Sequence, residues 1–295
     1  MANPNMLVVL GTSPDSYFLG YGRRLFVEGM PEAFAAHARD KLHIAMTTWI
    51  SMNPALDTWV DFNVQTNEFH FNADIGQDIR DHLSGVNGKA AAEFITFSDD
   101  PDPARFFLKG KQHAWWTAKL NDTLIQGIVA QQKSITGFDG AVTGVLFGKG
   151  NTFITMLSGG FVGSLDGEAR AADHALNKVL SEFSKGWCIE RGSTLCFYDS
   201  AYFFLKFKQP GGSTIQMRWN LPPNMATRLT ELQEIAKTPE EQQLLLIEDQ
   251  RALQLAQMRM NMEMGAYNGM ANLMTRGAAN IAAAASGGYV VERRW

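Results

Sequence analysis

Several residue types and patterns are scarce in this 295-residue chain. It has only two cysteines, which is too few for a disulfide framework. Charged residues make up 19%, and the net charge of −4 leaves no basic excess, so neither a disordered chain nor a nucleic-acid-binding one is indicated. No apolar run reaches the roughly 18 residues of a membrane span. The first residues lack the basic segment of a signal peptide, so we expect a cytoplasmic protein with reduced thiols.

Familiar catalytic and metal-binding motifs are absent from the sequence as well. No two of the six histidines stand at the i, i+4 spacing of a zinc helix, and no Cys-x-x-Cys, nucleophile elbow or P-loop occurs. The acidic group Asp99, Asp100 and Asp102 lacks the ligand spacing of a calcium loop, and its prolines are typical of a turn. We therefore expect no enzymatic activity, no cofactor and no metal ion.

What the chain does contain is a repeat. An apolar residue that begins a helical stripe follows a pair of strand-like segments five times, at Met30, Ile75, Leu120, Leu165 and Leu221. The first four are 45 residues apart and the last follows after 56. A large apolar residue stands four positions before each of them: Phe26, Phe71, Trp116, Phe161 and Met217. This periodicity predicts five units of one kind.

Each unit is predicted to contain three strands followed by one helix. The aromatic and β-branched segments are strand-like, and Pro, Asp, Asn and Gly separate them. The predicted first strands cover 6–10, 45–50, 93–97, 143–147 and 194–198, and the helices cover 31–42, 75–83, 122–131, 168–183 and 223–236. The units span about 6–42, 43–88, 89–133, 134–184 and 185–237. Because a strand that follows a helix usually returns parallel, we expect a small mixed sheet in each unit, with the helix on one face.

The fold class is therefore α/β, as a repeat of βββα units. Read cyclically the unit is ββαβ, and five such units about a pseudo-fivefold axis resemble the pentein, or α/β-propeller, architecture over residues 6–237. Closure is favoured over an open array because it removes exposed sheet edges. Pentein enzymes modify guanidino groups with a cysteine, a histidine and two carboxylates. The resemblance would give the nucleophile role to Cys196, although no matching acid and histidine signature accompanies it.

Residues 238–295 form a C-terminal helical arm with a composition of its own. The segment Thr238-Pro239-Glu240-Glu241 predicts a capped helix that runs to about Met264, and a Gly- and Ala-rich tail follows. Methionine-rich surfaces are common at protein contacts. We expect the arm to join copies of the chain into a homo-oligomer; packing on its own core is the alternative. The expected interface residues are Leu255, Met258, Met262, Tyr289 and Trp295.

Aromatic strand positions provide a candidate ligand site. Neighbouring residues of a strand point to opposite faces, so Trp115 and Trp116 cannot both enter one core. With Trp116 in the buried position, Trp115 shares its face with His70 and Gln216, which stand at the same offset in other units. These three residues are the candidates for binding a carbohydrate or small ligand, and packing against a neighbouring helix is the alternative.

Three functions follow, in order of preference. The first is a non-enzymatic structural or protein-interaction scaffold that self-associates through its arm. The second is a lectin-like module that binds carbohydrate or a small ligand, and the third is a pentein-like enzyme acting on guanidino groups.

Overall fold

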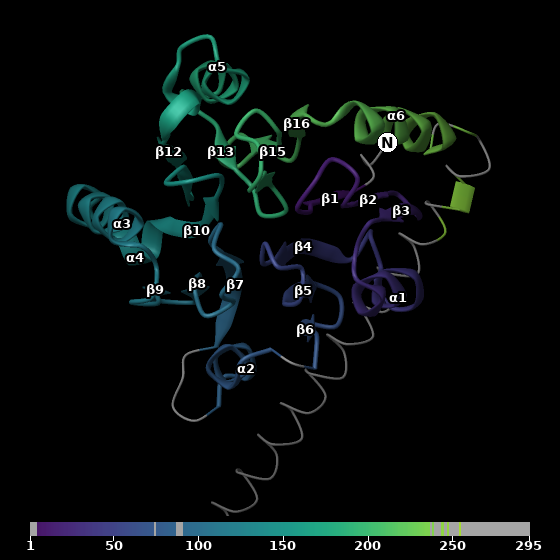
Figure 1. Ribbon diagram of the computed structural model, residues 1–295, viewed down its shortest axis with the longest axis horizontal. Coiled ribbons are helices and arrows are strands. Elements are labelled where there is room, and N and C mark those ends of the chain that lie inside the picture. Colours follow the sequence, from purple (N-terminus) through teal and green to yellow (C-terminus); the bar gives the residue numbers. More distant parts are fainter. Residues whose placement is uncertain are drawn as a thin grey trace, which may run out of the picture. The chain divides into compact units, whose positions relative to one another are not determined.

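A computed structural model describes residues 5–73, 75–86, 91–236 and 238, together with positions 243, 244, 247 and 254. The chain divides into two compact units, Met1–Gln242 and Gln243–Trp295. The first unit contains all the assigned strands and helices, which Figure 1 traces along the sequence. Within the described ranges, none of the helices combines the length and the apolar character that a membrane span requires.

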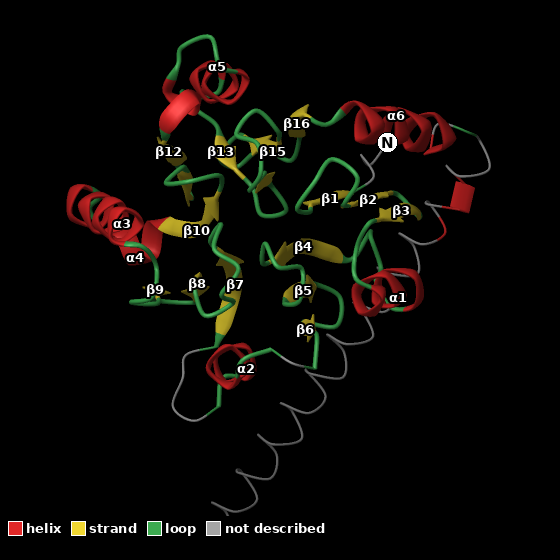
Figure 2. Cartoon of the chain, in the orientation of Figure 1, coloured by secondary structure: helices red, strands yellow, loops and turns green. Residues whose placement is uncertain are grey.

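The first unit is α/β and contains five small sheets, so the predicted repeat is present (Figure 2). The first four sheets each have three strands in chain order. Their strands are β1 (Met6–Leu10), β2 (Tyr17–Tyr21) and β3 (Arg24–Glu28); β4 (Thr47–Met52), β5 (Trp59–Asn63) and β6 (Glu68–Phe71); β7 (Ala92–Phe97), β8 (Phe106–Gly110) and β9 (Ala114–Trp116); and β10 (Val142–Phe147), β11 (Phe153–Leu157) and β12 (Gly160–Ser164).

The expectation of mixed sheets is wrong. Every assigned strand pair is antiparallel, from β1 with β2 through to β15 with β16. The reason is connectivity: the first strand of each unit pairs with the hairpin that follows it, and the helix then leads the chain into the next sheet. The unit is therefore a βββα meander, and the cyclic ββαβ reading does not describe its strand pairing.

The fifth sheet differs from the prediction of one first strand over 194–198. Two short strands, β13 (Cys188–Ile189) and β14 (Thr194–Leu195), pair with the two ends of β15 (Phe203–Lys208). β15 also pairs along its whole length with β16 (Ile215–Asn220). A turn at Gly192, whose φ is +84°, separates the two short strands. The Ser193 hydroxyl accepts the β15 hydrogen bond of the Lys206 N–H at 2.9 Å, so the interruption leaves that donor satisfied.

The helices are α1 (Glu32–Asp40), α2 (Gln77–Ser84), α3 (Asp122–Ser134), α4 (Phe138–Ala141), the 3₁₀ segment η1 (Gly167–Arg170), α5 (Ala175–Glu182) and α6 (Pro223–Ala236). The single helix predicted over 168–183 is broken into η1 and α5. The Asn177 amide donates to the carbonyls of Arg170 and Ala171 at 3.0 and 3.1 Å, which fixes the break. The short α4 was not predicted; Gly137, with a φ of +68°, precedes it.

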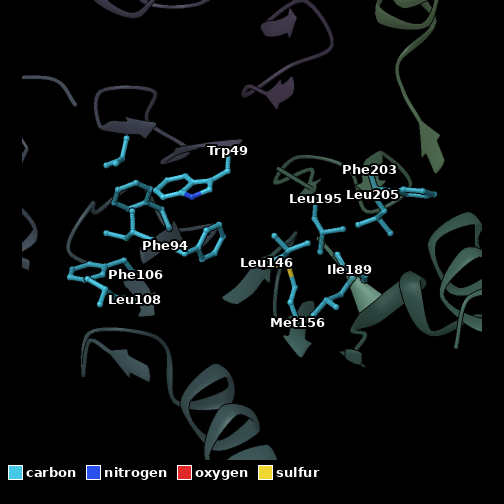
Figure 3. Close-up of a cluster of buried hydrophobic side chains, with 14 of the residues drawn as sticks. Trp49, Phe94, Phe106, Leu108, Leu146, Met156, Ile189, Leu195, Phe203 and Leu205 are labelled. Atoms are coloured by element: carbon cyan, nitrogen blue, oxygen red, sulfur yellow. The ribbon is translucent and has the colours of Figure 1, made fainter. Parts of the chain in front are cut away.

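Each unit's helix packs between its own sheet and the next one. In α1, the Phe34 ring lies 5.7 Å from Phe18 of β2 and 5.7 Å from Trp59 of β5. In α6, Met225 and Leu229 share a buried cluster with residues of the first and fifth sheets. The largest cluster gathers side chains from four sheets (Figure 3), among them Trp49, Phe94, Leu146, Met156 and Leu205. We use the word seam for each of these helix-to-next-sheet interfaces.

The first strands of different units also contact one another. The contacts join β1 to β4, β4 to β7, β7 to β10, β10 to β14 and β14 to β1. In Figure 1 these strands lie toward the middle of the first unit, with the helices around them. The sheet edges formed by first strands are thus covered by other first strands.

Candidate histidine–aspartate site

The hairpin register aligns the five sheets residue by residue. In each sheet, the last residue of the first strand pairs with the first residue of the second strand. These pairs are Leu10–Tyr17, Met52–Trp59, Phe97–Phe106, Phe147–Phe153 and Leu195–Phe203. Two residues further along the second strand stand Leu19, Asp61, Leu108, Thr155 and Leu205. Asp61 is the one ionisable residue in this column, and it is 0% exposed.

Two histidines from different elements bind the Asp61 carboxylate. His37 belongs to α1, and its Nε2 lies 2.7 Å from Oδ2. His70 lies directly across from Asp61 on β6, and its Nδ1 is 3.0 Å from Oδ1. When the carboxylate is ionised it can only accept, so both of these ring nitrogens donate. The opposite nitrogens, Nδ1 of His37 and Nε2 of His70, remain for other partners.

The buried carboxylate explains why two donors converge on it. Moving an ionised carboxylate out of water costs several kcal/mol unless hydrogen bonds or opposite charge compensate it. Within the described ranges, the ion pairs of Asp61 are with His37 and His70, not with a lysine or arginine. Neutral imidazoles supply hydrogen bonds, but full charge compensation requires a proton or a cation. The trio is therefore a place where positive charge is stabilised.

The two histidines line a cavity of about 780 Å³ between α1 and the β5–β6 hairpin. Its aromatic wall is formed by Trp59, Phe69 and Phe71. The His37 ring lies against Trp59, with ring centroids 4.4 Å apart, whereas the His70 side chain is 31% exposed. Polar groups complete the lining: Asp40, Lys41, Asp57 and Asn72. Apolar walls with a few convergent polar groups are typical of small-molecule sites.

Asn72 is a fixed part of this lining. Its amide donates to the Asp57 carbonyl at 2.7 Å, and its side-chain oxygen accepts from the Trp59 N–H at 3.1 Å. Both bonds tie the end of β6 to the start of β5, so the cavity wall is braced by the hairpin itself. The polar rim is preorganised before any ligand arrives.

The same seam geometry recurs in other units with different chemistry. In the next unit, His82 of α2 and Trp115 of β9 occupy the places of His37 and His70, and their rings are 4.9 Å apart. At the seam between α6 and the first sheet, the Arg228 guanidinium lies over the Phe26 ring at 5.0 Å. The carboxylate and its two histidines thus belong to the seam between α1 and the second sheet.

The structure places the three sequence-predicted ligand residues in three sheets. His70 lines the cavity described above. Trp115, 36% exposed, packs on His82 and on Phe106, whose ring is 5.2 Å away. Gln216 lies across from Phe207 on β16 and accepts a 3.5 Å hydrogen bond from Arg218. The strand register aligns Arg218, rather than Gln216, with His70 and Trp115, so counting from the helix misplaced the fifth unit.

The cysteines are not arranged as nucleophiles. Burial raises the pKa of the Cys196 thiol to about 11, and the Asp199 N–H donates to its sulfur at 3.4 Å. Burial also raises the pKa of Cys188, whose Sγ donates to the Ser158 carbonyl at 3.2 Å. Both thiols are therefore held in the protonated form, whereas the thiolate is the nucleophilic form of cysteine.

The acidic turn and the arm complete the predicted candidates. Asp99 accepts the Gly150 N–H at 2.7 Å, and Asp100 pairs with Arg105 at 3.0 Å, so both serve as turn and inter-unit contacts. The expected assembly residues Leu255, Met258, Met262, Tyr289 and Trp295 lie outside the described residues.

Neither Asp61 nor His37 was among the residues selected from the sequence. Positions were counted from the helix of each unit, and this count slips because the hairpin turn and the segment between the third strand and the helix both differ in length from unit to unit. Aligning the five units on the residue that begins the second strand shows one aspartate at a position where the other units have leucine or threonine. A charged residue that interrupts a buried repeat position is the signal that was available.

Comparison of the chain with profiles of protein families, with curated proteins and with solved structures finds no match.

Proposed function

We propose that the five units close into a pseudo-fivefold, propeller-type ring. Support comes from the contacts between β14 and β1 and from α6, which shares one buried cluster with the first and fifth sheets. Arg228 also stands seven residues after Leu221, as His37 stands seven after Met30. The last helix therefore uses the same helix position toward the first sheet that α1 uses toward the second.

We propose further that the protein is a non-enzymatic, lectin-like binding module whose ligand enters the cavity between α1 and the β5–β6 hairpin. The observation that carries this proposal is the buried Asp61, which orients two histidines on the wall of an aromatic cavity. A sugar or similar small polar ligand presents an apolar face to Phe69 or Phe71 and hydroxyls to His70 and Asn72. Aromatic faces and fixed polar groups are complementary to such a ligand.

The experiment screens the full chain against a glycan array and a small-ligand thermal-shift library. Hits are then measured by calorimetry on wild type, His70→Ala and Trp115→Ala. His70→Ala removes an oriented polar group from the cavity wall, and we expect at least about a tenfold loss of affinity, or roughly 1.4 kcal/mol. Trp115→Ala changes the equivalent position of the next unit and serves as the matched control.

Two results would contradict the proposal. One is the absence of any wild-type hit in both screens. The other is a hit that Trp115→Ala abolishes while His70→Ala leaves it unchanged, because the ligand would then occupy a different seam.

A further inference from the structure

We propose that His37, Asp61 and His70 form a binding site for one divalent transition-metal ion, with Zn²⁺ as the ion the donors suit best. This inference builds on the proposed function, because the ion would border the same cavity. It contradicts the expectation from motifs, which contained no metal site.

The three donors are already gathered. One ligand atom of each residue lies within 4.8 Å of the other two, and this is a group of three metal-ligand residues in the described part of the chain. Imidazole nitrogen and carboxylate oxygen are the usual ligands of zinc at about 2.0–2.2 Å, and four-coordinate sites are nearly tetrahedral. The facing nitrogens now lie 2.7 and 3.0 Å from the carboxylate oxygens, where their protons form hydrogen bonds.

A bound ion would take the place of those two protons, and this requires only a small movement of the ligand atoms. On binding, each neutral ring keeps its single proton but moves it to the nitrogen opposite the ion. Tetrahedral ligand atoms are about 3.3 Å apart at these bond lengths, so the donors must separate by a few tenths of an ångström. His70 is the ligand with freedom to move, because its side chain is 31% exposed, whereas Asp61 is fully buried.

The charge argument favours an ion over hydrogen bonds alone. A divalent cation compensates the negative charge of a carboxylate that is 0% exposed, which neutral imidazoles do not. Three protein ligands leave a fourth position, and the two histidines border the cavity, so a water molecule or a ligand oxygen can complete the coordination there. The equivalent leucine and threonine positions in the other sheets offer no such ligand.

Separation along the chain is also consistent with a functional site. His37 comes from α1 of the first βββα repeat, and Asp61 and His70 come from β5 and β6 of the second repeat. The three residues therefore meet only when the seam between these two repeats forms. Metal binding would therefore stabilise the folded state by mass action. Wild-type protein should show a higher melting temperature with Zn²⁺ than with EDTA.

The test uses the full chain, stripped with EDTA and titrated with zinc chloride by calorimetry, with Co²⁺ absorption spectra as a second readout. We expect one ion per chain. His37→Ala, Asp61→Asn and His70→Ala should each weaken binding at least about tenfold, because a loss of this size already follows when a residue that only orients a metal ligand is changed. His82→Ala, at the equivalent helix position of the next unit, and His113→Ala, on an exposed residue, are the controls.

The outcomes separate this inference from the proposed function. Absence of zinc binding by wild type, or Asp61→Asn binding zinc as wild type does, overturns the metal site. If Asp61→Asn does not fold, Asp61→Leu restores the residue found in three other sheets and replaces it in the test. A glycan that binds equally well in EDTA would leave the binding module standing without the ion, whereas zinc binding without any ligand hit would leave the ion standing without the module.

Discussion

At the residue scale, one buried side chain departs from the repeat. Asp61 interrupts a column of leucine and threonine, and it retains a buried charge where an apolar residue fits the fold. Replacing buried ionic groups with well-packed apolar ones is often neutral or stabilising. The aspartate is therefore better explained by function than by stability.

Lys206 is a second buried ionisable residue; Lys109 stands at the same register position of the third sheet and is also buried. Lys206 follows Leu205 on β15, its Nζ lies 3.1 Å from the Asn5 side-chain oxygen, and it borders a cavity of about 420 Å³ that Glu190 and Arg191 also line. Burial lowers the pKa of the Lys206 ammonium from 10.5 to about 8. The charged form is thus less stable in the folded protein than in the unfolded chain.

This shift predicts a pH dependence with a definite sign. Between pH 8 and 10.5 the unfolded chain binds more protons at Lys206 than the folded one, so this group makes the free energy of unfolding rise with pH. The slope is at most about 1.4 kcal/mol per pH unit. Lys206→Met removes that contribution.

Urea unfolding of wild type and Lys206→Met across this pH window measures the effect. The stability difference between them should favour the variant most below pH 8 and shrink toward pH 10.5. A difference that does not change with pH would show that Lys206 keeps an ordinary pKa in the folded protein.

At the scale of elements, each helix serves two sheets. The apolar residues of α1 enter a cluster with strands of the first and second sheets, including Phe18 and Trp59. A small sheet needs a hydrophobic face or a packed helix to be stable by itself. Sharing each helix helps to bury the inner strands of each small sheet, whereas the outermost strands, such as β3 and β12, stay partly exposed.

Phe34 tests this arrangement, because it is 0% exposed and contacts rings in both sheets. Phe34→Ala should lower the free energy of unfolding by about 3–5 kcal/mol, as expected for a large buried side chain. Arg39→Ala changes an exposed residue of the same helix and should alter it by less than about 0.5 kcal/mol. Equal effects of the two substitutions in urea unfolding would contradict the two-sided packing of α1.

The sequence was most informative about where elements lie and least about how they pair. The ranges of β1 and α6 were predicted to the residue, because a short apolar run marks the strand and a proline and an apolar stripe mark the helix. The strand pairing was not, because a mixed sheet and an antiparallel meander have the same order of elements. The break between η1 and α5 depends on a side-chain hydrogen bond of Asn177, which periodicity does not encode.

The site was only partly predictable for a related reason. His70 could be selected from its strand position, since alternation places it opposite a buried neighbour. Its pairing with Asp61 required the hairpin register, and its contact with His37 required the packing of α1 on the following sheet. Contacts across a seam join residues of different units, and they become visible only with the fold.

At the scale of the whole molecule, the proposed closure of the five units into a ring predicts that their order along the chain can be changed. A permuted chain that begins at residue 43 and carries residues 5–42 after Gln242, through a flexible linker, keeps every seam of a closed ring. Its melting temperature should lie within about 5 °C of the original, a shift worth roughly 1–2 kcal/mol. A permutant that aggregates, or melts in separate steps, would argue for an open array.

Self-association through residues 238–295 stays a prediction. The mass of the full chain in solution should exceed that of one copy, whereas a chain that ends at Gln242 should be monomeric. Light scattering coupled to size exclusion measures both. Monomers in both cases would remove the assembly role from the arm.

Because each helix is shared by two sheets, equivalent residue positions recur at successive seams. Three seams, at α1, α2 and α6, present the same helix position to the same strand position of the neighbouring sheet. The seam at α2 already holds His82 beside Trp115, with Leu108 in the place of Asp61. Leu108→Asp combined with Trp115→His would place an aspartate and a second histidine beside His82. The substituted seam would then contain the same three residue types as His37, Asp61 and His70.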